Sequence, residues 1–239
     1  MKCCLTTCSN RVQIGEGGLK ISQPIAVPRW YGFHHDECQS VQLHMFCNAS
    51  EIAYGAVAYF RTVTRGQVVS FVISKTRLPP IKTLTISRLE LQAAVVAARL
   101  KTKILEEIDF KVNETYFWSD SKIVLHYLSN VQRRFSVYVS HRVAEITSKS
   151  DINEWHHIPG TMNVADDCTS GKEIHELTPK CRWISGPQFL TLPEEEWPSF
   201  KEDLQVHESE LEVRASVDPN NVDRLFYACS RMGEVLYLE

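Results

Sequence analysis

The regular part of the chain opens with a strand-like alternation of apolar and polar positions. From residue 41 to residue 47 every second residue is apolar, which predicts a strand with one face on a core. Further strands are expected in residues 53–63 and 68–75, with a turn at Thr64-Arg65-Gly66 between them. Sequential strands joined by short connections favour an antiparallel meander.

The spacing of apolar residues then changes from two to three and four. Between Leu89 and Ile104 this spacing predicts a helix of about 20 residues that begins at Ser87. The elements expected after it are a buried strand in 115–119, a short helix in 122–128, an amphipathic helix in 137–148 and a strand in 154–158. The predicted fold is therefore α/β, a five-stranded mixed sheet of three antiparallel strands followed by alternating helix and strand, flanked by helices.

Three regions are predicted from this pattern. Residues 1–40 read as an irregular lead-in, 41–171 as the α/β domain and 172–239 as a C-terminal extension. The extension contains an acidic linker in 194–212 and a terminal helix in 222–231. The linker carries eight acids and one lysine, a net charge of −7, so the rest of the chain carries +4 because the whole has −3. That weak positive balance is compatible with a nucleic-acid partner without arguing for one unaided.

Composition indicates an intracellular protein, cytoplasmic or nuclear, with no membrane partner. No apolar run approaches the roughly 20 residues that span a bilayer, and the first residues lack a signal peptide's apolar stretch. The eight cysteines show no zinc-finger spacing, which favours reduced thiols in a reducing compartment. A small metal knot of Cys3, Cys4 and Cys8 with residues 34–38 is the alternative.

Four polar residues fall where strands and helices meet: Asn48, Glu90, Asp120 and Asp166. If the first and fourth strands are parallel neighbours, their carboxyl ends lie at one edge, and the four side chains meet there. Clustered oxygen ligands suit Mg²⁺ or Mn²⁺. Two such ions about 4 Å apart can activate water for phosphodiester hydrolysis.

Each of these residues also has a purely local interpretation. Glu90 would complete a capping box with Ser87. Asp120 and Ser121 would cap the helix that follows them. Asn48, Asp166 and Asp167 are of residue types that are common in turns and caps.

Short motifs along the chain carry a resemblance to one family. They are Phe46-Cys47-Asn48-Ala49-Ser50, Tyr54-Gly55-Ala56-Val57, Ser74-Lys75-Thr76-Arg77, Arg88-Leu89-Glu90-Leu91, Phe117-Trp118-Ser119-Asp120-Ser121 and Asn163-Val164-Ala165-Asp166. Together they resemble the RNase H region of the Pol polyprotein of BEL/Pao-type LTR retrotransposons. With flanking sequence such as Trp183 and Gly186-Pro187, the resemblance covers roughly residues 22–190. It implies an RNase H-like fold.

The resemblance also implies a function and its residues. Glu90, Asp120 and Asp166 match the family's metal-binding acids, and Asn48 stands where an aspartate would touch both metals. The implied reaction is endonucleolytic hydrolysis of the RNA strand of an RNA–DNA hybrid. The implied context is a polyprotein with adjoining reverse transcriptase and integrase segments.

Departures from the family pattern concentrate near the proposed chemistry. They are Asn48, Ser87, Val164 and the run Thr169-Ser170-Gly171. An amide offers one neutral carbonyl oxygen, whereas a carboxylate can bridge two ions with two anionic oxygens. Neither Asp167 nor Glu51 is expected to compensate. The sequence therefore predicts a degenerate copy with impaired hydrolysis and a weakened metal site.

Nucleic-acid contacts are predicted around the same site. Lys75, Arg77 and Arg88 would neutralise phosphates, and Ser50 and Ser121 would contact a ribose 2′-OH. Further basic residues nearby are Lys82, Arg133 and Arg134.

Two other functions stay open. One is an active nuclease despite Asn48, and the other is a structural or protein-interaction module that binds neither metal nor hybrid.

Overall fold

The structure is a computed structural model. It describes residues 40–63, 67–81, 84–170, 178, 181–198, 206–207 and 210–213. Several sequence predictions lie outside these residues: the lead-in up to residue 39, the turn at 64–66, Lys82, the N-terminal metal knot and the terminal helix.

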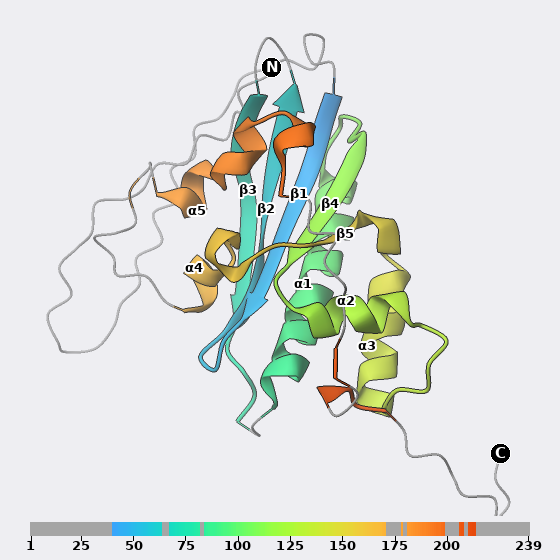
Figure 1. Cartoon of the computed structure of the whole chain (residues 1–239). Coiled ribbons are helices and arrows are strands. Elements are labelled where there is room, and N and C mark those ends of the chain that lie inside the picture. Colours follow the sequence, from blue (N-terminus) through green and yellow to red (C-terminus); the bar gives the residue numbers. More distant parts are fainter. Residues whose placement is uncertain are drawn as a thin grey trace, which may run out of the picture.

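A five-stranded mixed sheet forms the centre of the molecule (Figure 1). Its strands are β1 (Ser40–Ala49), β2 (Tyr54–Val63), β3 (Gln67–Arg77), β4 (Glu114–Ser119) and β5 (Trp155–His157). Their order is β3-β2-β1-β4-β5, in which β1 to β3 are antiparallel neighbours while β1, β4 and β5 run parallel. The predicted fold class is confirmed.

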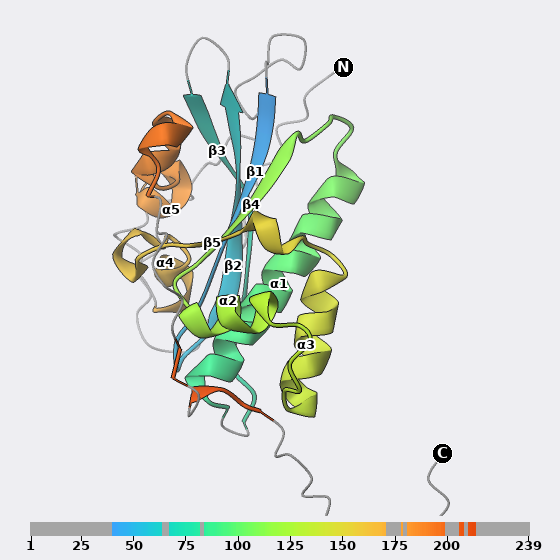
Figure 2. The ribbon, with the colours of Figure 1, turned by 45° about the vertical axis from the view of Figure 1, so that its right-hand side comes forward.

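Helices lie on one face of the sheet, as Figure 2 shows. They are α1 (Ile86–Glu107), α2 (Lys122–Ser129) and α3 (Val137–Thr147). The predicted apolar stripe of α1, from Leu89 to Ile104, is buried against β1 and β2. In the described part of the chain, no helix combines the length and the apolar character needed to cross a membrane.

The start of α1 differs from the sequence prediction. Thr85 is the N-cap residue, and its side chain accepts a hydrogen bond from the backbone N–H of Arg88. Ser87 lies inside the helix, so the capping box of Ser87 with Glu90 is wrong. Glu90 is thereby available for contacts outside its own helix.

Residues 181–198, named here the covering segment, lie with α4 (Asp166–Thr169) over the other face of the sheet (Figure 2). The segment contains α5 (Arg182–Ser185) and the short helices η5 (Gln188–Thr191) and η6 (Glu194–Glu196). Phe189 and Leu190 pack against Phe46 of β1 and its neighbours in a second core cluster. Strand β1 is consequently buried on both faces, not on the single face that its alternation predicts.

Arg61 of β2 holds the covering segment against the sheet through hydrogen bonds. Its side chain is buried, and its Nε and Nη2 atoms donate to the carbonyl oxygens of Leu190 and Leu192 at 2.8 and 2.9 Å. Its Nη1 atom donates to Gln42 at 2.7 Å, and its guanidinium lies 4.9 Å from the Trp197 ring centroid. A buried cation with this many acceptors fixes the backbone that supplies them.

Two acids of the predicted linker contact the domain. Glu194 accepts hydrogen bonds from Gln42 and Arg61, and Glu212 forms an ion pair with Arg88. At these two positions the acidic run is held by specific partners.

Candidate functional site

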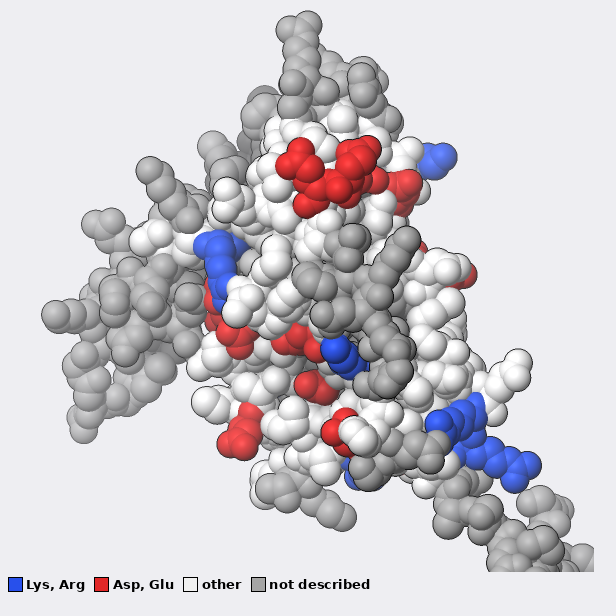
Figure 3. Space-filling view, viewed as in Figure 1, with Lys and Arg blue, Asp and Glu red and all other residues white. Residues whose placement is uncertain are grey.

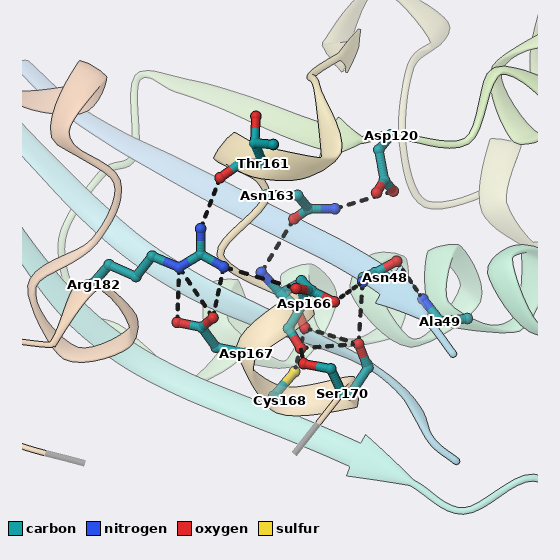
Figure 4. A network of polar contacts seen from close by, with 12 residues as sticks. Asn48, Ala49, Asp120, Thr161, Asn163, Asp166, Asp167, Cys168, Ser170 and Arg182 are labelled. Carbon is teal, nitrogen blue, oxygen red and sulfur yellow. Dashed lines mark hydrogen bonds and ion pairs between the residues drawn. The ribbon is translucent and has the colours of Figure 1, made fainter. Parts of the chain in front are cut away.

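The sheet topology brings the predicted site residues to one edge. Because β1 and β4 are parallel neighbours, their carboxyl ends lie together, with Asn48 near the end of β1 and Asp120 directly after β4. Asp166 begins α4 after β5, where a turn was predicted. Figure 4 shows Asn48, Asp120 and Asp166 around the end of β1.

The amide of Asn48 is directed at Asp166. Its Nδ2 atom donates to Asp166 Oδ1 at 3.2 Å and to Thr169 Oγ1 at 3.1 Å, while its Oδ1 atom accepts from the N–H of Ala49 at 2.7 Å. A reversed amide would set two oxygens against each other and two donors against each other, so the hydrogen bonds define its orientation. We name Asn48, Asp166 and Thr169 the Asn48 network.

Asn163 positions Asp120. This fully buried side chain donates from Nδ2 to Asp120 Oδ1 at 3.2 Å and to the carbonyl oxygen of Cys47 at 3.0 Å. Its Oδ1 atom accepts from the N–H of Ala165 at 3.1 Å. One amide thus links β1, the end of β4 and the residue before Asp166. Sequence reasoning missed this role, although Asn163 opens the Asn-Val-Ala-Asp motif that was noted.

Glu90 reaches the same edge through Ser121. The Ser121 hydroxyl donates to Glu90 Oε2 at 2.6 Å and accepts from the N–H of Val124, so it also caps α2. Burial raises the pKa of Glu90, the Ser121 hydrogen bond opposes that rise, and the charge of Asp120 adds to it. The capping prediction is confirmed for Ser121.

The pKa of Asp120 is also raised. Burial is the main cause, hydrogen bonds including that from Asn163 oppose it, and the charge of Asp166 adds to it. Asp120 is therefore close enough to both Glu90 and Asp166 for their charges to repel its own. Burial disfavours the charged forms of Glu90 and Asp120.

Arg182 is a cation at this edge that the sequence reasoning did not identify. Its Nε and Nη2 atoms donate to Asp167, its Nη1 atom donates to the carbonyl oxygen of Thr161 at 2.8 Å, and its Nη2 atom lies 3.9 Å from Asp166 Oδ2 (Figure 4). Asp167 is buried and faces Arg182, away from Asn48. The covering segment thus supplies a positive charge to α4.

The residues predicted to contact nucleic acid differ in their surroundings. Ser50 Oγ donates to the carbonyl oxygen of Thr169 at 2.6 Å, Ser121 is bonded to Glu90, and Arg88 is paired with Glu212. Lys75 and Arg77 are exposed near the end of β3. The proposed roles of all five stay predictions.

Side-chain alternation also assigns Lys75 and Arg77 to a face of β3. Thr76 directs its hydroxyl to the carbonyl oxygen of Cys168 in α4 at 3.5 Å. Alternation therefore places its two neighbours on the opposite face of the strand, toward the α1 side. On the face seen in Figure 3, acidic side chains are exposed in the region between α4 and α2.

The donor set does not fit the two-metal site that the resemblance implies. Asn48 presents N–H groups to Asp166, and its single oxygen already accepts from the chain's own backbone. In the described ranges no group of three or more His, Cys, Asp or Glu side chains is arranged to hold a metal ion. An N–H donor where a ligand oxygen is needed opposes cation binding.

The strand order, the helices on one face of the sheet, the covering segment on the other face and the edge of acids define an RNase H-like α/β domain. Residues 10–121 match the family described as the Pao retrotransposon-like RNaseH-like domain. This is the family that the sequence motifs indicate, so the recognition made from the motifs is confirmed.

Solved RNase H structures are similar to this chain at low identity. An RNase H1 from the archaeon Halobacterium salinarum NRC-1 has 13% identity and a TM-score of 0.35, covering 54% of this chain and 92% of that one. The N-terminal RNase H domain of Rv2228c from Mycobacterium tuberculosis has 13% identity and a TM-score of 0.38, covering 54% and 90%. A search of curated proteins found no match.

Proposed function

We propose that this chain is a retrotransposon-derived RNase H-like domain that binds an RNA–DNA hybrid but hydrolyses it poorly or not at all. The ancestral reaction is cleavage of the RNA strand. The observation that carries the proposal is the hydrogen bond from Asn48 Nδ2 to Asp166 Oδ1.

The neutral charge of the Asn48 side chain and the direction of its hydrogen bond both argue against hydrolysis. An aspartate at position 48 would add one negative charge and turn lone pairs toward the acids. The amide instead adds no charge and directs N–H groups at Asp166 and Thr169. Magnesium and manganese need oxygen ligands with free lone pairs, so the edge is poorly suited to either ion.

The inferred ligand and context follow from the family. We infer an RNA–DNA hybrid as the nucleic acid and a Pol polyprotein with reverse transcriptase and integrase segments as the surroundings. The exposed basic residues Lys75 and Arg77 support contact with phosphates. Glu90, Asp120 and Asp166 are the acids that an active relative would use.

A comparison of the natural chain with Asn48→Asp tests the proposal. Labelled hybrid is incubated with each protein and Mg²⁺ or Mn²⁺, and RNA cleavage is followed alongside hybrid binding. We expect both proteins to bind and only Asn48→Asp to cleave. The double variant Asn48→Asp/Asp120→Asn is the control, because restored cleavage should disappear with it.

The other outcomes are equally informative. Efficient cleavage by the natural chain would contradict the proposal and favour an active nuclease. Failure of both proteins to bind hybrid would favour a structural or protein-interaction module. If both proteins bind hybrid and neither cleaves it, the cause of inactivity would lie at other departures from the family pattern, Val164 and Ser170.

A further inference from the structure

Residues 210–213 dock where α1, α2 and α3 meet. The side chain of Leu211 is buried, Val213 forms an isolated antiparallel bridge with Phe135, and the N–H of Glu212 donates to Tyr127 Oη at 3.0 Å. Figures 1 and 2 both show this stretch passing beneath α2 from the start of α1 toward α3. We name residues 210–213 the docked segment.

The carboxylate of Glu212 accepts hydrogen bonds from side chains that are suited to binding an anion. Arg88 donates to its two oxygens from Nε and Nη2 at 2.6 and 2.7 Å, and Ser136 donates from Oγ at 2.9 Å. These hydrogen bonds, that of Arg88 first, lower the pKa of Glu212, so the group is anionic at neutral pH. Ser136 is the N-cap of α3, whose positive end adds to the attraction.

An arginine fork of this kind suits phosphate as well as carboxylate. Guanidinium donates two parallel hydrogen bonds to either anion. Arg88 is also held in place by the Tyr138 ring, 4.5 Å from its guanidinium, and Arg142 stacks on the same ring at 3.7 Å. Arg134, two residues before Ser136 in the chain, is exposed. Without Glu212, these groups would form a preorganised basic site.

The site lies on the same helices as the acid edge. Arg88 precedes Glu90 by two residues in α1, and Tyr127 belongs to the helix that Ser121 caps. Arg88 and Glu90 both lie in the first turns of α1, so the Glu212 site and the acid edge lie at the same end of that helix. Within the docked segment, Val213 forms the isolated bridge to Phe135, and the carbonyl oxygen of Glu212 accepts from the N–H of Ser136 at 2.7 Å.

The geometry points to Glu212 as an internal phosphate mimic: the docked segment fills a backbone-phosphate site at Arg88 and Ser136, and a nucleic-acid strand must displace it to bind there. The assignment of nucleic acid as the competing ligand rests on the proposed function. The anion site itself rests on the contacts of Glu212.

Hybrid binding by the full chain with Glu212→Gln tests the competition. Fluorescence anisotropy of a labelled RNA–DNA hybrid is measured at about 50 mM and about 200 mM salt. We expect Glu212→Gln to tighten binding about threefold or more at the lower salt, with a salt slope steeper by about one for the added phosphate contact. Glu210→Gln is the matched control, because it removes the same charge from an exposed position of the same segment.

Two results would overturn the competition. One is an equal effect of Glu212→Gln and Glu210→Gln, which would indicate a general loss of repulsion. The other is a gain that persists in Arg88→Gln/Glu212→Gln, where the fork is absent. Circular dichroism spectra and melting curves of each variant establish that the folded proteins are being compared.

Inorganic phosphate separates failure of this inference from failure of the proposed function. The Arg88 Nε–Hε resonance is followed by NMR during a phosphate titration of Glu212→Gln and of the natural chain. A shift that saturates only in Glu212→Gln supports the anion site even if no protein binds hybrid, an outcome that would refute the proposed function alone. No shift in Glu212→Gln would overturn the anion site.

Discussion

Asn48 joins two parts of the chain that a metal ion would otherwise be expected to hold together. It links the end of β1 to α4 through Asp166 and Thr169, both of which accept from its Nδ2 atom. A neutral donor here relieves the repulsion that an aspartate would create beside Asp166. The amide of Asn48 thereby stabilises this edge with hydrogen bonds between protein groups.

We predict that Asn48→Asp lowers the free energy of unfolding by roughly 1–3 kcal/mol in metal-free buffer near neutral pH. The new carboxylate loses the two donated hydrogen bonds and faces Asp166. Urea denaturation measures the loss, and Gln132→Glu, at an exposed position, is the charge-matched control. An equal effect of the two changes would contradict the role given to the Asn48 network.

The same variant should show a defined pH dependence. Repulsion from Asp166 raises the folded-state pKa of the new carboxylate above its unfolded value. The folded protein then binds more protons at intermediate pH, so the penalty is present above the folded-state pKa and is lost as the pH falls below the unfolded value. Denaturation at several pH values checks this, and a penalty that grows toward acid pH would refute it.

The charged form of Glu90 is predicted to lower the free energy of unfolding. Its folded-state pKa is raised by burial, so the free energy of unfolding falls as the pH rises through the interval above its ordinary value. Glu90→Gln keeps an oxygen acceptor for Ser121, and it should have a higher free energy of unfolding than the natural chain at neutral pH. Below that interval the gain should vanish. Glu106→Gln, an exposed change in the same helix, should show neither effect.

At the scale of elements, the covering segment and α4 form one layer over the sheet. Arg61 fixes the covering segment through hydrogen bonds to Leu190 and Leu192. Arg182 joins the same segment to α4 through its hydrogen bond to Asp167. Gly186 permits the bend between α5 and η5, because its φ is +79° and a Cβ there would lie 2.7 Å from Val69. The position of α4, and so of Asp166, depends on this layer.

Arg61→Met should therefore destabilise the fold by on the order of 3 kcal/mol, because it leaves buried carbonyl oxygens and Gln42 without their donor. Faster hydrogen exchange in the covering segment should accompany the loss. Arg99→Met is the matched control, since Arg99 is exposed and the loss of its ion pair with Glu145 should cost less than about 1 kcal/mol. Similar losses in the two variants would refute the anchoring role of Arg61.

At the scale of the whole molecule, the fold should be stable without divalent ions. Hydrogen bonds of Asn48 and the ion pair of Arg182 organise the edge with protein groups alone. We predict that Mn²⁺ or a chelator leaves the melting temperature of the natural chain unchanged, whereas Mn²⁺ raises that of Asn48→Asp by a few degrees through binding to the folded state. Stabilisation of both proteins by Mn²⁺ would contradict the prediction.

Most of the fold was predictable because its signals are local. The alternation in β1 and the stripe of α1 depend on residues a few positions apart, and both elements form as expected. The second face of β1 was not predictable in this way. Gln42 and His44 look like solvent-facing residues in the alternation, yet both are buried, with Arg61 and Trp118 as respective partners.

The candidate site divides in the same manner. Motif spacing is sufficient to place Asn48 and three acids at the ends of elements, and to show that position 48 lacks a charge. Only the tertiary structure decides that the amide donates to Asp166, which is 118 residues away, and that Arg182 and Glu212 reach the domain from the C-terminal part. Local periodicity depends on near neighbours, whereas the direction of a buried hydrogen bond depends on which remote segment packs against it.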